Sequence, residues 1–232
     1  MPATAPFTPD ALAFLRALER NNRREWFQQR RERYDELLKQ PMVAVIEQLG
    51  EQFRSFAPEL MADPRRSLYR IRRDTRFSAD KRPLKTNVAA VFPHRHGDRH
   101  SSAGLYLEIS ARHVFAGGGL YRPDSAGLQQ VRARIAADPE AFARVVGAPA
   151  LDKAGGLRGE SLQRVPRGYR ADHPAADHLK RKQFLVWSEW EPELATSARF
   201  WPALLETFRA TAPLLRYLND ALGVPARARP AL

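Results

Sequence analysis

Residues 104–117 constrain the fold more than any other part of the chain. The segment 104–110 alternates between apolar and polar side chains, which predicts a β-strand with one covered face. Leu105, Leu107 and Ile109 point one way, and Tyr106, Glu108 and Ser110 point the other way. Ala111-Arg112 leaves room only for a short turn, so residues 113–117 should return beside the first strand as an antiparallel hairpin.

Three further segments have the composition of strands: residues 67–72, 87–92 and 183–190. In the first of these, alternation places Tyr69 and Ile71 on the opposite face from the arginines. The last has apolar side chains at both odd and even positions, so we expect it to be a central strand covered on both faces. With the hairpin, these segments predict a mainly antiparallel sheet of about five strands.

Helical patterns occupy both ends of the chain. The expected helices cover about residues 10–20, 22–39 with Asn22 as cap, a third from Pro41, then 125–137, 139–146, 175–182 and 192–222. Pro213 should break or kink the last of them. Helices at both ends with strands between them predict an α+β fold, as one domain over residues 9–224 with loose tails at 1–8 and 225–232.

Composition narrows the class of protein. The chain has 44% hydrophobic residues, enough for a core, and no cysteine, which excludes disulfides, a thiol nucleophile and thiolate metal sites. The N-terminus does not have the pattern of a secretory signal, and no apolar run is long enough for a membrane span. These features predict a soluble cytoplasmic protein without a membrane partner.

Positive charge is concentrated in two segments. Residues 64–85 hold seven arginines and two lysines against Asp74 and Asp80, which is +7 of the formal net charge of +12. A guanidinium binds carboxylate or phosphate through two parallel hydrogen bonds and stays charged at any physiological pH. The segment therefore predicts an anion site formed by Arg70, Arg72, Arg73, Arg76, Lys81 and Lys85. Asp74, held as an anion among the arginines, would orient them rather than act as a base.

The second basic segment, residues 158–182, contributes a further +4. We expect its residues Arg164, Arg167 and Tyr169 to close the same pocket from a second loop. Asp172 and His173 can be interpreted as an acid–base pair, because a carboxylate can fix the tautomer of an imidazole. They can equally be an N-cap before Pro174. Glu108 is a further weak catalytic candidate.

Two other motifs are weaker. Consecutive glycines at 117–119 could let a backbone approach a ligand or could simply end a strand. His94, His96 and His100 with Asp98 have a spacing that can chelate a metal, but their polar, Pro- and Gly-flanked surroundings favour a solvated loop. We therefore predict no metal site, and no motif identifies a cofactor.

Several segments in order resemble one known family. They are N-N-R-R-E-W-F, R-I-R-R-D-T-R-F-S-A-D-K-R-P-L-K-T-N, L-Y-L-E-I-S with F-A-G-G-G-L-Y-R-P, and R-V-P-R-G-Y-R-A-D-H-P with L-K-R-K-Q-F. Together they are similar to the family known as domain of unknown function 2461, over nearly the whole chain. The resemblance implies a single-domain protein typical of bacteria and fungi, and it implies no activity, cofactor or catalytic residue.

The leading hypothesis is a protein that binds an anionic, phosphate-bearing small molecule in an arginine-rich pocket. One alternative is an enzyme that acts on such a ligand through acid–base residues of the second basic loop. Another is a surface for the nucleic-acid backbone; only Tyr69 and Phe77 interrupt the first basic run, which argues against base stacking on it. A last alternative is a scaffold whose arginines pair with carboxylates of the same chain.

Overall fold

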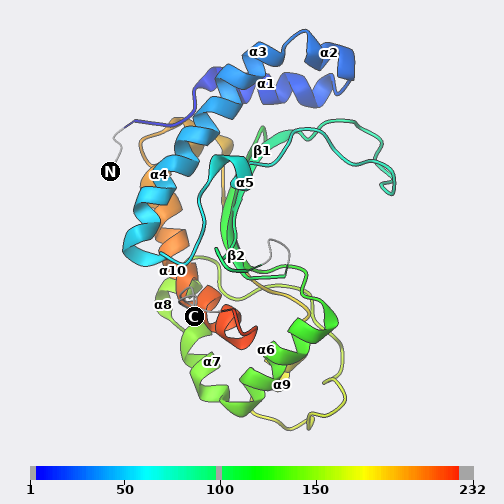
Figure 1. Ribbon diagram of the computed structural model, residues 1–232, viewed down its shortest axis with the longest axis vertical. Coiled ribbons are helices and arrows are strands. Elements are labelled where there is room, and N and C mark those ends of the chain that lie inside the picture. The colour runs from blue at the N-terminus through cyan, green and yellow to red at the C-terminus, as the bar shows by residue number, and fades with distance from the viewer. Residues whose placement is uncertain (1–3, 98–100, 225–232) are drawn as a thin grey trace, which may run out of the picture.

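A four-stranded antiparallel sheet lies at the centre of the protein, whose computed structural model describes residues 4–97 and 101–224 (Figure 1). The strands are β1 (Asn87–Phe92), β2 (Gly104–Ser110), β3 (Val114–Leu120) and β4 (Phe184–Trp190), in that order across the sheet. The α+β class is confirmed, and β2 and β3 form the expected hairpin, with Gly104 opposite Gly119 and Ile109 opposite Val114.

The prediction of a fifth strand at residues 67–72 is wrong. This segment touches the sheet through one bridge, between Leu68 and Ala90, and a 2.9 Å hydrogen bond from the Tyr69 amide to the Ala89 carbonyl. The chain then leaves the sheet and pairs with its own later residues, with Arg72 opposite Leu84. Alternation of side chains identified an extended segment, but it cannot say which segment pairs with it.

The expected central position of residues 183–190 is also wrong, because β4 is an edge strand. Its two faces are apolar for different reasons. Phe184 and Val186 are buried in the core, whereas Leu185 and Trp187 are half-buried on the opposite, open face of the sheet. Apolar side chains at both odd and even positions of β4 therefore reflect two apolar faces: one packs in the core, and the other lines the open face of the sheet.

The helices precede, interrupt and follow the sheet. Before it come α1 (Pro9–Arg20), α2 (Arg24–Gln28), α3 (Arg31–Tyr34), the π-helical turn η1 (Asp35–Lys39), α4 (Gln40–Phe56) and α5 (Pro64–Ser67). Between β3 and β4 lie α6 (Ser125–Ala137), α7 (Pro139–Val146), α8 (Pro149–Lys153) and α9 (Ala176–Leu179). The 3₁₀ turn η2 (Pro192–Thr196) and α10 (Phe200–Ala221) end the described chain.

The helix boundaries predicted from prolines and N-cap residues were the least accurate. Helix α3, the π-turn and α4 follow one another without a break, so Pro41 lies inside a continuous helix. The wider π-turn before it accommodates a residue that lacks an amide hydrogen. Pro213 likewise lies within α10, on its exposed side, and does not end the helix. Asn22 does not cap α2; its side chain exchanges two 3.0 Å hydrogen bonds with the backbone of Leu84.

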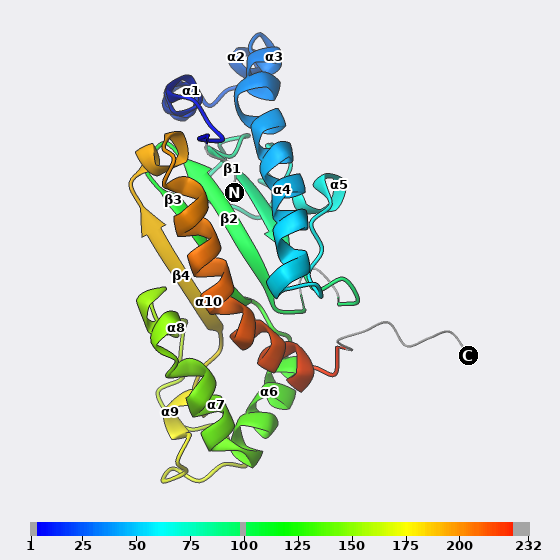
Figure 2. The same cartoon turned by 90° about the vertical axis from the view of Figure 1, so that its left-hand side faces the viewer.

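One face of the sheet carries the core. Helices α4 and α10 cross this face side by side (Figure 2). Phe53 of α4, Phe92 of β1 and Phe208 of α10 are buried there with ring centroids 5.3–6.2 Å apart. Phe7, within the segment expected to be a tail, is also buried, with its ring 6.5 Å from that of Phe200.

Among the residues that the structure describes, no helix layer covers the other face of the sheet. Two segments project from its ends on the same side and give the molecule the outline of a C in Figure 1. We call residues 69–86 the arm; its two sides are joined by hydrogen bonds from Arg73 N to Pro83 O and from Lys85 N to Ile71 O. The second projection consists of α6, α9 and the connection from 154 to 183. No helix in the described part of the chain is long and apolar enough to cross a membrane.

The first prediction concerns two glycines whose replacement by alanine should change the stability of the protein in opposite directions. Gly119→Ala should destabilise the protein by about 1–3 kcal/mol or more, because its φ of 136° is strained for alanine and a Cβ there would overlap the Phe184 carbonyl oxygen. Gly50→Ala, inside α4 with only ordinary contacts at 3.5 Å, should stabilise by about 1 kcal/mol. Urea unfolding of both variants measures this; equal effects of the two would contradict the described pairing of β3 with β4.

Candidate functional site

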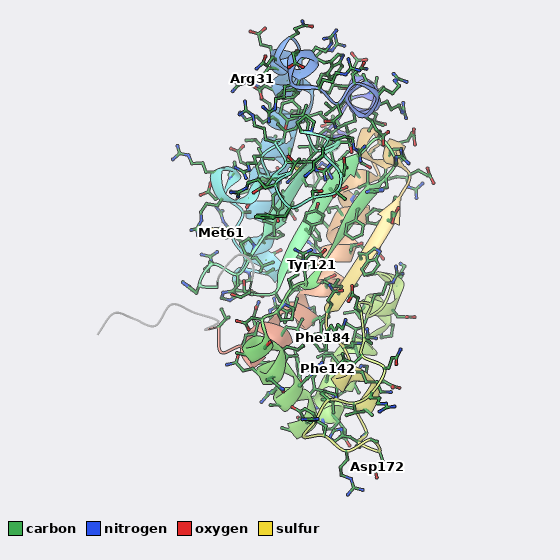
Figure 3. All side chains as sticks on the ribbon, turned by 90° about the vertical axis from the view of Figure 1, so that its right-hand side faces the viewer. Arg31, Met61, Tyr121, Phe142, Asp172 and Phe184 are labelled. Atoms are coloured by element: carbon green, nitrogen blue, oxygen red, sulfur yellow. The ribbon has the colours of Figure 1, made fainter. Side chains whose placement is uncertain are left out.

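The open face of the sheet is the floor of a large cavity. Its volume is about 1290 Å³, and its lining comes from all four strands, the base of the arm and the start of the second basic segment. It runs from Lys85 and His113 at the arm end to Arg122 and Gln183 at the other end. The view onto this face in Figure 3 shows Tyr121 over the sheet.

Four aromatic side chains run across this floor, and we call them the aromatic row. They are Tyr69, Tyr106, Phe115 and Trp187. Neighbouring ring centroids are 6.2, 6.0 and 5.9 Å apart, and the last pair is stacked with an interplanar angle of 27°. All four rings are half-buried, so each retains surface that a ligand can touch.

The alternation of the strands builds the row. Tyr106 lies opposite Gly117 on β3, which in turn lies opposite Trp187 on β4. A Cβ at Gly117 would lie only 2.6 Å from the Trp187 Cβ, so the glycine leaves the space that Trp187 needs. The glycines at 117–119 are therefore explained by strands lying close to one another. They lie within β3 rather than ending it.

A cation is stacked on each end of the row. The Lys85 ammonium lies 4.2 Å from the centre of the Tyr69 ring. The Arg158 guanidinium lies 4.7 Å from the Trp187 ring and donates a 2.7 Å hydrogen bond to the Gly155 carbonyl. Cation–π contacts of this kind hold long, flexible side chains over the rings.

A carboxylate–imidazole cluster lies beside the row, and we call it the Glu108 cluster. Tyr106 donates a 2.5 Å hydrogen bond to Glu108 Oε2, and His113 Nε2 lies 3.2 Å from Glu108 Oε1. The Glu189 carboxylate lies 3.5 Å from His113 Nδ1. Burial, reinforced by the negative charge of Glu108, raises the pKa of Tyr106, so its hydroxyl remains a donor at physiological pH.

The β2–β3 turn fixes the imidazole of this cluster. The Ser110 hydroxyl accepts from the amides of Arg112 and His113, at 3.2 and 3.0 Å, and donates to the His113 carbonyl at 3.1 Å. The side chains of Glu108 and His113 are only 18% and 29% exposed, so they are ordered yet open to the cavity. A carboxylate that holds one nitrogen of an imidazole leaves the other nitrogen for proton transfer.

In the arm, several predicted anion ligands already have partners. Arg73 lies 2.5 Å from Asp80, Arg76 lies 2.7 Å from Asp74, and Lys81 donates to the Thr75 carbonyl. The hydrogen bonds from Arg76 lower the pKa of Asp74 to about 2 and hold its carboxylate against that guanidinium. Arg70 and Arg72 are exposed on the arm. Lys85 alone of the predicted cations is among the cavity-lining residues of the described chain.

The second basic segment contributes less to the cavity than expected. Arg164 and Arg167 are exposed away from the cavity lining, and Tyr169 packs partly against the core. Asp172 pairs with Arg170 at 2.7 Å and lies at the far tip of the molecule in Figure 3. His173 Nδ1 accepts a 3.0 Å hydrogen bond from the Ala175 amide, but neither His173 nor Asp172 caps α9, because the N-cap of that helix is Ala175. The arm and this segment lie at opposite ends of the open face (Figure 1).

The histidine loop is occupied with local contacts. His94 is buried, and its Nδ1 accepts a 3.2 Å hydrogen bond from the His96 amide. Burial lowers the pKa of His94. Asp98 and His100 lie outside the described residues. Within residues 4–97 and 101–224, no group of three or more His, Cys, Asp or Glu side chains is placed so that it could hold a metal ion.

Sequence reasoning missed His113, Phe115 and Trp187 and gave Glu108 only a weak role. A signal for part of this set was available. The alternation in residues 104–110 already places Tyr106 and Glu108 on one face, and His113 directly precedes the strand that returns beside it. Tyr69 and Trp187 come from distant segments, so no local pattern could have added them.

The second prediction tests the pairing within the arm. Arg76→Gln should raise the pKa of Asp74 from about 2 toward its ordinary value of 3.8, because it removes the main hydrogen bonds to that carboxylate. Any stability that Asp74 gives the arm is present above pH 3.8 and is lost as the pH falls through about 2. Carboxyl-carbon NMR titration measures the pKa. Arg66→Gln, exposed on α5, is the matched control, and an Asp74 pKa near 3.8 in the unaltered protein would mean that Arg76 is not engaged there.

Comparison with known proteins identifies the family. Residues 10–217 match the model of the family described as "Conserved hypothetical protein (DUF2461)", so the chain belongs to that family and the expected resemblance is confirmed. No curated protein and no solved structure matches the chain.

Proposed function

We propose that this member of the DUF2461 family binds an anionic, phosphate-bearing ligand across the open face of its sheet. The observation that carries the proposal is a cavity with an aromatic floor and a basic segment at each end. Ligand sites are concave and mostly apolar, with a few polar groups that fix orientation. This cavity has that composition and is large enough for such a ligand.

The cations that would hold the anion lie at the ends of the cavity. Lys85 and Arg122 line it, Arg158 is stacked on its floor, and Arg70 and Arg72 are exposed on the adjoining arm. Arg73 and Arg76 bind carboxylates of the same chain, so their role would be to hold the arm in shape. The Glu108 and Glu189 carboxylates flank His113 near the arm end of the floor and repel an anion there, which leaves the exposed arm arginines and the opposite end of the cavity for phosphate.

The third prediction tests this with inorganic tripolyphosphate in thermal unfolding. At about 100 times its Kd, a ligand stabilises by about 2.7 kcal/mol, which raises Tm by roughly 5–10 °C for a chain of this size. The double variant Arg70→Gln/Arg72→Gln should lose most of this shift, because it removes two exposed guanidinium groups beside the cavity.

The matched control removes the same charge elsewhere. Arg54→Gln/Arg144→Gln lies on α4 and α7, where both arginines are exposed on helix surfaces outside the cavity lining. It should keep the full shift. Equal shifts in the two double variants would remove the arm arginines from the proposal, and no shift in the unaltered protein would remove the anion site.

A second candidate function is acid–base catalysis on the bound ligand, favoured by the 3.2 Å contact between Glu108 and His113 inside the cavity. In this mechanism Glu108 fixes the ring and His113 Nδ1 moves the proton. Glu189, whose side chain is 56% exposed, can swing away from Nδ1. The acid–base pair would then belong to β2 and β3 rather than to the second basic loop.

The fourth prediction separates these two locations. Any phosphorylated metabolite that stabilises the protein is incubated with it, and conversion is followed by phosphorus NMR. Glu108→Gln and His113→Gln should each slow conversion by about 10²–10⁴-fold, the usual contribution of a general acid or base. Asp172→Asn and His173→Gln should leave the rate unchanged. A rate that depends on Asp172 or His173 instead would refute the role of the Glu108 cluster.

A further inference from the structure

The geometry points to single-stranded nucleic acid as the ligand of the open face, with its bases stacked over the aromatic row and its phosphates held by the two basic segments. This inference rests on the proposed function and names the ligand class for the same site. It differs from a phosphate-backbone surface, because here the bases make the central contacts.

The extent of the site favours a polymer over a small molecule. Typical small-molecule pockets have volumes of about 300–1,000 Å³, and this cavity has about 1290 Å³. The arm and the 158–182 segment lie at its two ends, so one small phosphate cannot contact both (Figure 1). An extended polyanion can contact Lys85 and the arm arginines at one end and Arg158 at the other.

The floor of the cavity suits stacked bases. Four half-buried rings lie next to one another across the sheet, with neighbouring centroids 5.9–6.2 Å apart. Aromatic rings on a four-stranded sheet stack two or three bases in a common class of RNA-binding domain, and stacking of this kind tolerates any base. Two more exposed rings extend the path: Tyr121, 58% exposed in the cavity, and Phe77, 96% exposed on the arm.

Each of these outer rings has an arginine beside it. The Arg122 guanidinium lies 5.1 Å from the Tyr121 ring, and the Arg76 guanidinium lies 5.7 Å from the Phe77 ring. The Tyr121–Arg122 pair can bind a nucleotide through its base and its phosphate together, whereas Arg76 is held by Asp74 and leaves Phe77 as a stacking ring only. The path therefore alternates between groups that stack and groups that carry positive charge.

The carboxylates on the floor select single strands over duplexes. Glu108 and Glu189, which flank His113, repel phosphates from this part of the floor, but they can accept hydrogen bonds from the exocyclic amines of bases. A duplex hides the base faces and keeps those amines within its grooves, where a flat floor cannot reach them, and it presents phosphates along both edges. A single strand can turn its bases toward the floor and its phosphates toward the basic ends.

The test is fluorescence anisotropy with a labelled single-stranded DNA of about 12 nucleotides, within the usual site size of about 4–16 nucleotides. We expect it to bind at least tenfold more tightly than the same sequence as a duplex. Phe115→Leu keeps an apolar side chain in the middle of the row but loses the ring, so it should weaken binding about 5- to 150-fold, the value of one stacked base.

Two further variants distinguish a loss of binding from a loss of folding. Tyr121→Leu changes an exposed residue, so it leaves folding intact and should weaken binding in the same direction. Phe56→Leu replaces a half-buried ring outside the cavity lining and should bind as the unaltered protein does. Circular dichroism and thermal unfolding verify that each variant is folded.

The outcomes separate this inference from the proposed function. Equal affinity for single strand and duplex, or unchanged binding by both Phe115→Leu and Tyr121→Leu, overturns the inference, and the anion site survives if tripolyphosphate still stabilises the protein. If neither the oligonucleotide nor tripolyphosphate binds, both proposals fall.

Discussion

The packing of α10 and α4 against one face of the sheet is the constraint on which the rest of the structure depends. Phe208, Phe53 and Phe92 form its centre, and each is fully buried or nearly so. Loss of one such ring costs about 3–5 kcal/mol, a large part of the stability of a typical domain. Because alternate side chains of a strand point in opposite directions, this packing also decides which residues are left on the open face.

This packing also determines which side chains lie on the open face of the sheet. Leu105, Leu107 and Ile109 go into the core, so Tyr106 and Glu108 must face the cavity. The same rule sends Trp187 to the open face of β4. Because α4 and α10 lie on the other face, the half-buried rings on this side keep exposed surface that a second helix layer would cover. Exposed apolar surface of this kind commonly marks a binding site.

The arm shows how carboxylates of the same chain organise a dense group of arginines. Asp80 holds Arg73 and Arg82, and Asp74 holds Arg76, so two carboxylates organise three guanidinium groups. Exposed ion pairs of this kind contribute about 0–1 kcal/mol each, too little to fix the arm alone. The firm anchor is at its base, where Leu84 is buried and its backbone is bound by Asn22. Arg70 and Arg72 remain exposed beside that anchor.

Features of this structure that depend on residues close in sequence could be predicted, whereas features that depend on distant residues could not. The β2–β3 hairpin and the α+β class follow from residues close in sequence, and both are confirmed. The hydrogen bonds between Asp74 and Arg76 are equally local. The prediction of a fifth strand was wrong because the partner of an extended segment is determined by residues far away in the sequence. The aromatic row could not be found for the same reason: Tyr69 and Trp187 are separated by more than a hundred residues and meet only through the sheet.

This non-local origin also changes the argument about base stacking. Within the first basic run the aromatic residues are too few to form a stacking surface, which is why the sequence favoured a small anion. In the folded protein the rings come from the sheet and the cations come from its ends, so each segment supplies one half of the chemistry. A basic run that is poor in aromatics is therefore weak evidence against stacking whenever it borders an open sheet face. The relevant quantity is the set of rings that the fold brings within reach of the cations, here Tyr69 beneath Lys85 and Trp187 beneath Arg158.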